Sequence, residues 1–489
     1  MKNSIKIFTA IILVAFVGFA IIACDSGSTG ANNDTGTDGT GGGSGSTGGG
    51  GSGTGTSVTC THVWGVWTLT SQAAHCAGNT HGNGVETATC TLCNATSTRL
   101  TPCLGTAGLQ LIPVAGGYAL PSYPANAFNR ALVGAVCIPD YNPANPGQPV
   151  INIPVNSFGV EGHIPNPNLA SIRIGENVTS IDWAAFYFCI NLTSVFIPRS
   201  VTSIGYAAFM HCTGLMSITV DAANPNFLSQ DGVLFNKTGT TLIIMPAGRS
   251  GNYAIPNNVT HIGEVAFVRS SLTSVTIPHS VTSIGDEAFR GNGFTSITVD
   301  AANPNYSSQG GVLYNKAGTT LLFVPGAVTG SFAIPNGVER IHGRALSGSL
   351  TNISIPSSLI DGIHADHTFS DMPNLMTITV DAANPIFSSQ GGVLYNKAGT
   401  TLLYMPRAVT GSFAIPNGVG SIGNHAFDSS SLTSIAIPNS VTSLGAQAFW
   451  GWTSSQTIQV PFINLAAADT AWGGDDWRMG SNAAIVFAP

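Results

Sequence analysis

A short motif that recurs through most of the chain sets the limits on its fold. Residues 272–289 read LTSVTIPHSVTSIGDEAF, and close copies occupy residues 192–209 and 432–449. The last apolar residue of the first half returns every 22 or 23 residues, as at Ile174, Ile197 and Val220. A fixed period in the low twenties is typical of solenoid repeats. The chain is therefore predicted to build its core from many copies of one small unit.

Each half of the motif has its own physical role. In Leu-x-x-Val-x-Ile the apolar residues point into a core and the residues between them face water, as a strand requires. Pro278 cannot donate to a strand ladder, so the strand is expected to end there. The following Val-Thr-Ser-Ile-Gly is a second short extended piece with Gly285 at its turn, and Ala288 and Phe289 then enter the interior. Because no unit can close its core alone, the units must stack as a solenoid of parallel strands.

A longer period is superimposed on the short one. Val-Asp-Ala-Ala-Asn-Pro begins at Val220, Val299 and Val380, with spacings of 79 and 81 residues. Each copy is followed by Gly-Val-Leu-(Phe/Tyr)-Asn-Lys-x-Gly-Thr-Thr-Leu, whose two apolar runs around Asn-Lys-x-Gly predict a β-hairpin. Each super-repeat is thus expected to hold two ordinary coils and one coil enlarged by a hairpin, with 12 or 13 strand positions in all.

The motif also resembles a known family. Leu-Thr-Ser-Val-x-Ile-Pro-x-Ser-Val-Thr-Ser-Ile-Gly-x-x-Ala-Phe is similar to the signature of BspA-like leucine-rich repeats, the Treponema-type class, over roughly residues 137–460. The resemblance implies a β-rich solenoid with short irregular or helical convex segments and inserted hairpins. It also implies a bacterial surface protein without enzymatic activity that adheres to host matrix, host cells or other bacteria. The rival interpretations are a structural envelope protein without a specific ligand and a glycan-binding accessory protein.

The first residues predict export and a lipid anchor. Lys2 and Lys6 precede an almost wholly apolar run that ends at residue 22, and Ile-Ile-Ala-Cys24 resembles the bacterial lipobox. That resemblance implies lipidation of Cys24 and attachment to the outer membrane or cell surface, although Asp25 favours the inner membrane in some bacteria. A plain transmembrane anchor is the alternative, but the run is short for one and ends in a cysteine. Residues 25–57, rich in Gly, Ser and Thr, are predicted to be a disordered tether.

Residues 58–104 form a separate Cys- and His-rich module by sequence. Cys90-x-x-Cys93 on a turn between two Thr-rich strands suits a tetrahedral zinc site, which Cys60 and His62 could complete. Disulfides are the alternative, because they suit an exported chain. The module's cysteines are odd in number, but Cys137 lies just beyond. The module is followed by an N-terminal edge repeat at 105–170, the main repeats at 171–460 and a C-terminal cap at 461–489.

Composition argues against several functions. Only 8% of residues are charged, the formal net charge is −7 and no basic run occurs, whereas nucleic-acid binding needs clustered Lys and Arg. No catalytic motif is present, and His364-x-Asp366-His367 is more consistent with a polar loop than with a metal or catalytic site. Cys189 and Cys212 occupy the same repeat position and are predicted to be free, buried thiols, with a disulfide between them as the alternative.

The strand pattern predicts where a ligand would bind. The outward positions of Leu-x-x-Val-x-Ile form one column of mostly Ser and one of mostly Thr, so the strand face is small, polar and nearly uncharged. Arg173 and Phe196 are the exceptions, and Arg and large aromatics are common at binding hot spots. The predicted ligand-binding residues are Arg173, Phe196, Thr219, Thr276, Thr298 and Thr379.

Overall fold

The computed structural model describes most of the chain from residue 109 onward, together with the backbone of three earlier strands. These strands, β1 (Thr68–Ser71), β2 (Gly84–Thr89) and β3 (Thr96–Thr101), form an antiparallel sheet in the order β1-β2-β3. Strands β2 and β3 lie on either side of the Cys-x-x-Cys segment, as the sequence predicts. The other described residues are 109–122, 132–145, 147–159, 166–291, 293–346, 348–363, 368–369 and 371–487.

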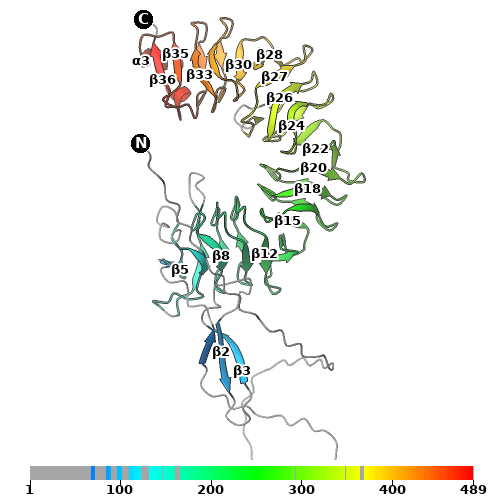
Figure 1. Cartoon of the computed structure of the whole chain (residues 1–489), viewed down its shortest axis with the longest axis vertical. Helices are drawn as coiled ribbons and strands as arrows, with labels where there is room; N and C mark the ends of the chain where they lie inside the picture. The colour runs from blue at the N-terminus through cyan, green and yellow to red at the C-terminus, as the bar shows by residue number, and fades with distance from the viewer. Residues whose placement is uncertain are drawn as a thin grey trace, which may run out of the picture. The chain divides into compact units, whose positions relative to one another are not determined.

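These later residues form a parallel-strand β-solenoid of about 13 coils, which Figure 1 traces in chain order from β5 to β36. The Leu-x-x-Val-x-Ile segments are its main strands, and they pair in parallel with the main strands of neighbouring coils. They group into four sheets: β6 (Gly134–Cys137), β8 (Leu169–Arg173), β10 (Ser194–Ile197) and β12 (Ser217–Val220); β16 (Gly251–Ala254), β18 (Leu272–Ile277) and β20 (Ser296–Val299); β24 (Thr329–Ala333), β26 (Ser349–Ile355) and β27 (Thr377–Val380); β31 (Gly411–Ala414), β33 (Leu432–Ala436), β35 (Thr457–Val460) and β36 (Ala484–Phe487).

The Val-Thr-Ser-Ile-Gly segments form a second set of shorter strands. They also pair in parallel between coils, and in three of the four groups they join the strands of a hairpin coil. The groups are β4 (Ile112–Val114), β5 (Gly117–Ala119), β7 (Val150–Ile153), β9 (Ser180–Ile181) and β11 (Ser203–Ile204); β13 (Phe227–Gln230), β14 (Val233–Asn236), β15 (Thr241–Ile244), β17 (His261–Ile262) and β19 (Ser283–Ile284); β21 (Tyr306–Gln309), β22 (Val312–Asn315), β23 (Thr320–Phe323) and β25 (Arg340–Ile341); β28 (Phe387–Gln390), β29 (Val393–Asn396), β30 (Thr401–Tyr404), β32 (Ser421–Ile422) and β34 (Ser443–Leu444).

The predicted hairpin around Asn-Lys-x-Gly is confirmed, since β14 and β15 pair antiparallel. Each hairpin coil also contains an earlier strand, such as β13, that the sequence did not predict because its Phe-x-Ser-Gln pattern is largely polar. This extra strand and its turn cover the edge of the preceding main strand. The Ile218 amide donates to the Gly232 carbonyl at 2.8 Å, and the Val220 amide donates to Ser229 Oγ at 3.0 Å. Edge amides that would otherwise lack a partner are satisfied in this way.

The hairpin coils divide the solenoid into blocks. The main-strand ladder stops at β12, β20 and β27 and restarts at β16, β24 and β31. The ladder of shorter strands stops at β11, β19 and β25 and restarts with the hairpin strands β13, β21 and β28. The buried apolar residues of the described chain likewise fall into four clusters that follow the same division. Each block is therefore a short solenoid with its own core, joined to the next through a hairpin coil.

A fully buried asparagine fixes the start of each hairpin coil. Asn303, in Val-Asp-Ala-Ala-Asn-Pro, has no exposed surface. Its Nδ2 donates to the Pro278 and Val281 carbonyls at 2.8 and 3.0 Å. Its Oδ1 accepts from the Asn305 and Tyr306 amides at 2.9 and 2.8 Å. Asn224 and Asn384 repeat the same four contacts in the other super-repeats.

The Ala-Phe segments at Phe186, Phe209 and Phe289 are turns rather than helices, and their phenylalanines stack between coils. The rings of Phe158, Phe186 and Phe209 lie 5.4 and 5.1 Å apart and are nearly parallel. The predicted free, buried thiols are confirmed at Cys189 and Cys212. The Cys212 thiol donates to the Phe186 carbonyl at 3.1 Å, and burial raises its pKa to about 12. The thiol therefore stays protonated and acts as a structural donor.

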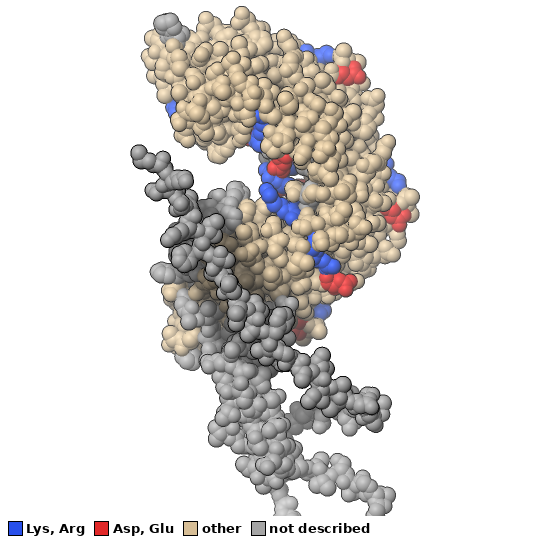
Figure 2. Space-filling view, viewed as in Figure 1, with Lys and Arg blue, Asp and Glu red and all other residues tan. Residues whose placement is uncertain are grey.

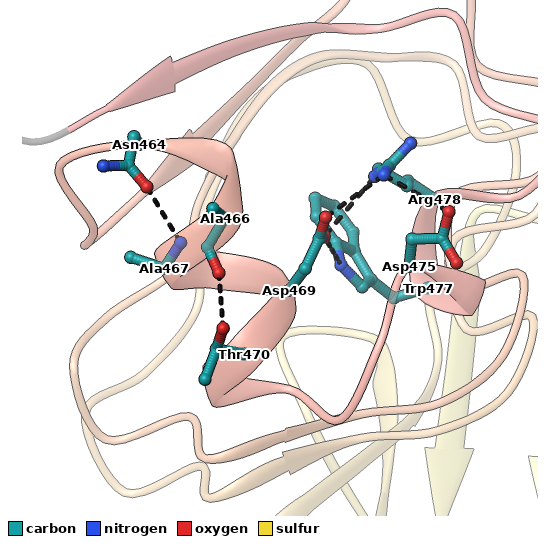
Figure 3. Close-up of polar contacts among 8 residues, drawn as sticks. All are labelled: Asn464, Ala466, Ala467, Asp469, Thr470, Asp475, Trp477 and Arg478. Carbon is teal, nitrogen blue, oxygen red and sulfur yellow. Dashed lines mark hydrogen bonds and ion pairs between the residues drawn. The ribbon is translucent and has the colours of Figure 1, made fainter.

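The residues after β35 close the last core. Helix α3 (Leu465–Ala471) begins at Asn464, whose Oδ1 accepts from the Ala467 amide, and the 3-10 helix η1 (Asp476–Arg478) follows. Trp477 is buried, and its Nε1 donates to Asp469 Oδ1 at 3.0 Å (Figure 3). Strand β36 then extends the parallel ladder beyond Val460, where the sequence pattern had faded.

The Asp469 carboxylate provides a pH-dependent link in this segment. Hydrogen bonding from Arg478 holds the pKa of Asp469 below its ordinary value, against the opposing effect of burial. A depressed pKa means that the carboxylate stabilises the folded segment above pH about 4, and that this contribution is lost as the pH falls through the folded-state value. We expect Asp469→Asn to destabilise residues 464–487 at pH 7 by less than about 1 kcal/mol and to remove the acid-dependent loss. Hydrogen exchange between pH 3 and 7, corrected for intrinsic rates, measures this. An identical pH response in both proteins would contradict it.

Candidate binding surface on the Ala-Phe turns

The column of Thr side chains predicted on the main strands does point outward. Thr276 pairs in register with Thr298, and both are exposed, as are Thr219 and Thr379. Ser354 Oγ lies 2.9 Å from Thr379 Oγ1, so neighbouring hydroxyls bond to each other along the column. The strand face is therefore small and polar, and part of its hydrogen-bonding capacity is already used internally.

The prediction that Arg173 points outward into solvent is wrong, and Phe196 is less exposed than predicted. Arg173 is only 6% exposed, and Phe196 is half-buried. Arg173 is buried because the adjoining first coil covers it. Its Nη1 lies 3.7 Å from Cys137 Sγ on β6. Cys137 is itself disulfide-bonded, and its partner lies outside the described residues. Arg173 therefore cannot present its guanidinium as an exposed anchor.

Other predicted sites lie outside the described residues. They are the lipidation site Cys24, the zinc candidates Cys60, His62, Cys90 and Cys93, and the polar loop His364, Asp366 and His367. Within the described ranges, no group of three or more His, Cys, Asp or Glu side chains could hold a metal ion. The zinc site and its disulfide alternative thus stay predictions.

Charged and aromatic side chains gather instead on the Ala-Phe turns. Figure 2 shows blue and red atoms clustered in a hollow while most of the visible surface is tan. We call this surface the turn face, and its members lie on the turns or directly beside them. They are Trp183, Tyr187, Tyr206, His211, Arg269, Glu287, Arg290, Arg344, Asp371, Arg407 and Asp428.

Ion pairs between different coils hold the centre of the turn face. Arg290 bonds Asp371 at 2.9 Å, a residue 81 positions further along the chain, and Glu287 at 3.0 Å. Arg344 also bonds Glu287, at 3.0 Å. Burial lowers the pKa of Arg290, but its bonds to Asp371 and Glu287 outweigh this and raise the pKa above the ordinary value. The Arg290 guanidinium is therefore fixed in position and charged.

A second pair lies at one side of this cluster. Arg407 Nη2 bonds Asp428 Oδ2 at 2.6 Å, and Arg407 Nε donates to the Asp428 carbonyl at 3.1 Å. Both side chains are largely buried. Arg407 is therefore also held in one orientation.

Arg269 differs from these arginines. Its side chain is exposed, and no carboxylate of the described residues lies within ion-pair distance of it. Burial raises the pKa of nearby Tyr187, and that of Tyr206 on the next coil, so both phenols stay neutral and can donate hydrogen bonds. The turn face thus offers a free guanidinium beside neutral aromatic donors.

These side chains border an open hollow with a volume of about 490 Å³. Arg269, Arg290, Arg407 and Asp371 line it together with apolar groups from Met210, Val268 and Pro373. Glycines at 291, 293, 326 and 348 supply much of the remaining lining, so backbone is accessible there. The arrangement suits a ligand with both a charged and an apolar part.

The repeats themselves decide the family. A family model described as BspA type leucine rich repeat region matches six copies, at residues 161–247, 249–310, 327–410 and 404–469. These residues make up more than half of the chain. The chain belongs to the BspA-type leucine-rich repeat family. Members of this family are generally non-enzymatic binding proteins.

Solved structures of other leucine-rich repeat proteins are similar to this BspA-type chain. A leucine-rich repeat protein from Eubacterium ventriosum ATCC 27560 shares 22% identity over 70% of this chain and 92% of that chain, with a TM-score of 0.37. A leucine rich cell surface protein from Faecalibacterium prausnitzii A2-165 shares 23% identity over 80% and 96%, with a TM-score of 0.33. The pneumococcal vaccine antigen PcpA shares 14% identity over 78% and 100%, also with a TM-score of 0.33. Since these scores are low, the family assignment depends on the repeats alone.

No curated protein matches the sequence. Among the described residues, none of the helices has the length and apolar character needed to cross a membrane.

The turn face could have been found from the sequence of the BspA-type repeats. Positions on either side of Ala-Phe change from coil to coil, from Trp183 and Tyr206 to Glu287 and Arg290, whereas the strand columns keep Ser and Thr. Variable Trp, Tyr and Arg in an otherwise uniform repeat are the residues enriched at binding hot spots. The signal was missed because turns have no regular inward and outward alternation.

Proposed function

We propose that this BspA-type protein is a surface-exposed lipoprotein that binds other proteins through its turn face. One observation carries the proposal: Trp, Tyr and Arg concentrate on the turn face of a chain in which only 8% of residues are charged. Extended surfaces formed by stacked repeats commonly serve as binding surfaces.

Comparing two surfaces of one solenoid tests the proposal. Purified full chain in detergent is presented to host matrix proteins, host cells, bacterial cells and a glycan array. We expect Tyr206→Ala to weaken binding to the captured protein at least about tenfold, because interface Tyr and Arg carry much of the binding energy. The paired Thr276→Ala and Thr298→Ala variant is the control and should bind like wild type.

Two outcomes would overturn this proposal. Loss of binding in the Thr variant alone would return the site to the strand face. Binding only to glycans, a class that the exposed Trp183 and Tyr206 on neighbouring coils also suit, would change the class of ligand. Circular dichroism of each variant shows that its fold is intact.

The anchor is a separate part of the proposal. Cys24 and the apolar segment before it support lipidation, and residues 25–57 would then reach about 30 Å as a flexible coil. We expect the mature protein to partition into the detergent phase of a Triton X-114 separation. Cys24→Ser should shift it to the aqueous phase or leave it unprocessed, because no thiol would carry the lipid. A Cys24→Ser protein that still labels with radioactive palmitate would defeat the assignment.

A further inference from the structure

We infer that the hollow on the turn face binds a carboxylate side chain of a protein partner, with Arg269 as its anchor. The inference rests on the proposed function and names the chemistry of the partner. Arg269 is exposed at the edge of the hollow and has no carboxylate partner among the described residues. A guanidinium binds a carboxylate through two parallel hydrogen bonds, which fixes both position and orientation.

The other arginines of the hollow do not have this freedom. Arg290 is held by Glu287 and Asp371, and Arg407 is held by Asp428. Their positive charges remain close to the hollow but are largely compensated within the protein. Arg269 is therefore the one described guanidinium at this site whose charge is left for a ligand.

The same carboxylates limit which anions can bind. Asp371 lies in the lining, and Glu287 and Asp428 pair with the lining residues Arg290 and Arg407. The whole chain also has a formal net charge of −7. A polyanion such as a sulfated polysaccharide would be repelled by these carboxylates and by the net negative charge of the chain. A single carboxylate can still bind to Arg269. A single acidic side chain on a polypeptide is the better match.

The apolar lining indicates what should stand beside that acidic residue. Met210, Val268 and Pro373 contribute to the hollow next to the arginines. Methionine adapts its shape to different apolar groups. The hollow, at about 490 Å³, has space for more than one side chain. The expected ligand is therefore an exposed segment with an Asp or Glu next to an apolar residue.

A peptide library tests this chemistry directly. Heptapeptides with acetylated N-termini and amidated C-termini carry carboxylates only on Asp and Glu, and they are screened against the purified full chain in detergent. We expect the selected peptides to contain an acidic residue next to an apolar one. Replacing that Asp or Glu by its amide should weaken binding at least about tenfold, as loss of a charge-assisted pair does.

Matched variants locate the site. Arg269→Gln should lower affinity for the selected peptides by a similar factor, and Arg269→Lys should retain part of it. Arg199 is also exposed and lies outside the turn face, so Arg199→Gln should bind like wild type. Equal binding by Arg269→Gln and wild type, selection of peptides without acidic residues, or failure to select any peptide would overturn the inference. Binding to heparin with no acidic peptide selected would do the same.

The inference and the proposed function can fail separately. If the chain captures a protein and Arg269→Gln captures it equally well, the carboxylate site is wrong and the binding function stands. If the wild-type chain captures no protein or cell, the proposed binding function is wrong. Peptide binding at Arg269 would then show a carboxylate site that does not serve protein capture.

Discussion

Asn303→Ala is expected to lower the free energy of unfolding by about 4 kcal/mol. It leaves one carbonyl and two amides of the backbone without partners, and it removes one of the two hydrogen bonds to the Pro278 carbonyl. The side chain of Asn303 is fully buried and joins two carbonyls of one coil to two amides at the start of the hairpin coil. Alanine supplies neither donor nor acceptor, and water cannot easily replace them in a buried position. Guanidinium unfolding measures the total effect, and hydrogen exchange should show the loss centred on residues 296–315.

Two further variants sharpen this test. Asn303→Asp keeps the shape and one acceptor but removes the donors to the Pro278 and Val281 carbonyls, so we expect it to be destabilised as well. Asn305→Ala is the matched control, because its half-buried side chain makes one long bond of 3.5 Å to the Thr282 carbonyl. If Asn303→Ala and Asn305→Ala had the same stability, the asparagine ladder would not carry the role given to it here.

Gly285→Ala is expected to cost about 3 kcal/mol, at the upper end of the usual cost of overpacking. A Cβ atom at Gly285 would lie 2.5 Å from the amide nitrogen of Glu264 on the preceding coil. A Cβ atom has no freedom to rotate away from its own backbone, and the atoms that it would meet are backbone atoms of Gly263 and Glu264. The contact can therefore be relieved only by separating two coils. Gly205 and Gly445 show the same close approach, at 2.4 and 2.3 Å.

The same motif position provides its own control. Gly423 follows a hairpin coil, and a Cβ atom there would come only as close as 3.3 Å to the Leu402 carbonyl oxygen. His342 occupies the equivalent position after another hairpin coil and already has a side chain. We therefore expect Gly423→Ala to cost less than about 1 kcal/mol. Thermal unfolding of the two variants compares them, and equal losses would rule out coil spacing as the cause.

The sequence predicted those parts of the fold that depend on regular periods. Inward residues such as Val275 and Ile277 alternate with outward ones such as Thr276, so the strand columns and their register followed from a two-residue period. The hairpin around Asn-Lys-x-Gly followed from two apolar runs and a turn. Strand β13 was missed because Phe227–Gln230 has little apolar pattern, and its pairing depends on a neighbouring coil.

The candidate site was predicted less well, for a related reason. The pattern places Arg173 outward on its own strand but cannot show that the adjoining coil covers it. The pairing of Arg290 with Asp371 joins residues 81 positions apart, and it depends on how the intervening coil is shaped. Contacts between distant coils depend on how the coils stack, so the sequence of a single repeat does not predict them.

The division into blocks has a mechanical consequence if the chain is pulled from its two ends. The strand ladders are interrupted after β12, β20 and β27, so a pulling force meets fewer backbone hydrogen bonds at these joints than within a block. Stacked repeats are stabilised mainly by their neighbours, and a block that has lost one neighbour is weakened. Under load the solenoid should therefore extend in steps, each releasing a super-repeat of 79 or 81 residues, or about 270 Å of chain. Such stepwise extension would absorb tension between two surfaces while the remaining blocks stay folded.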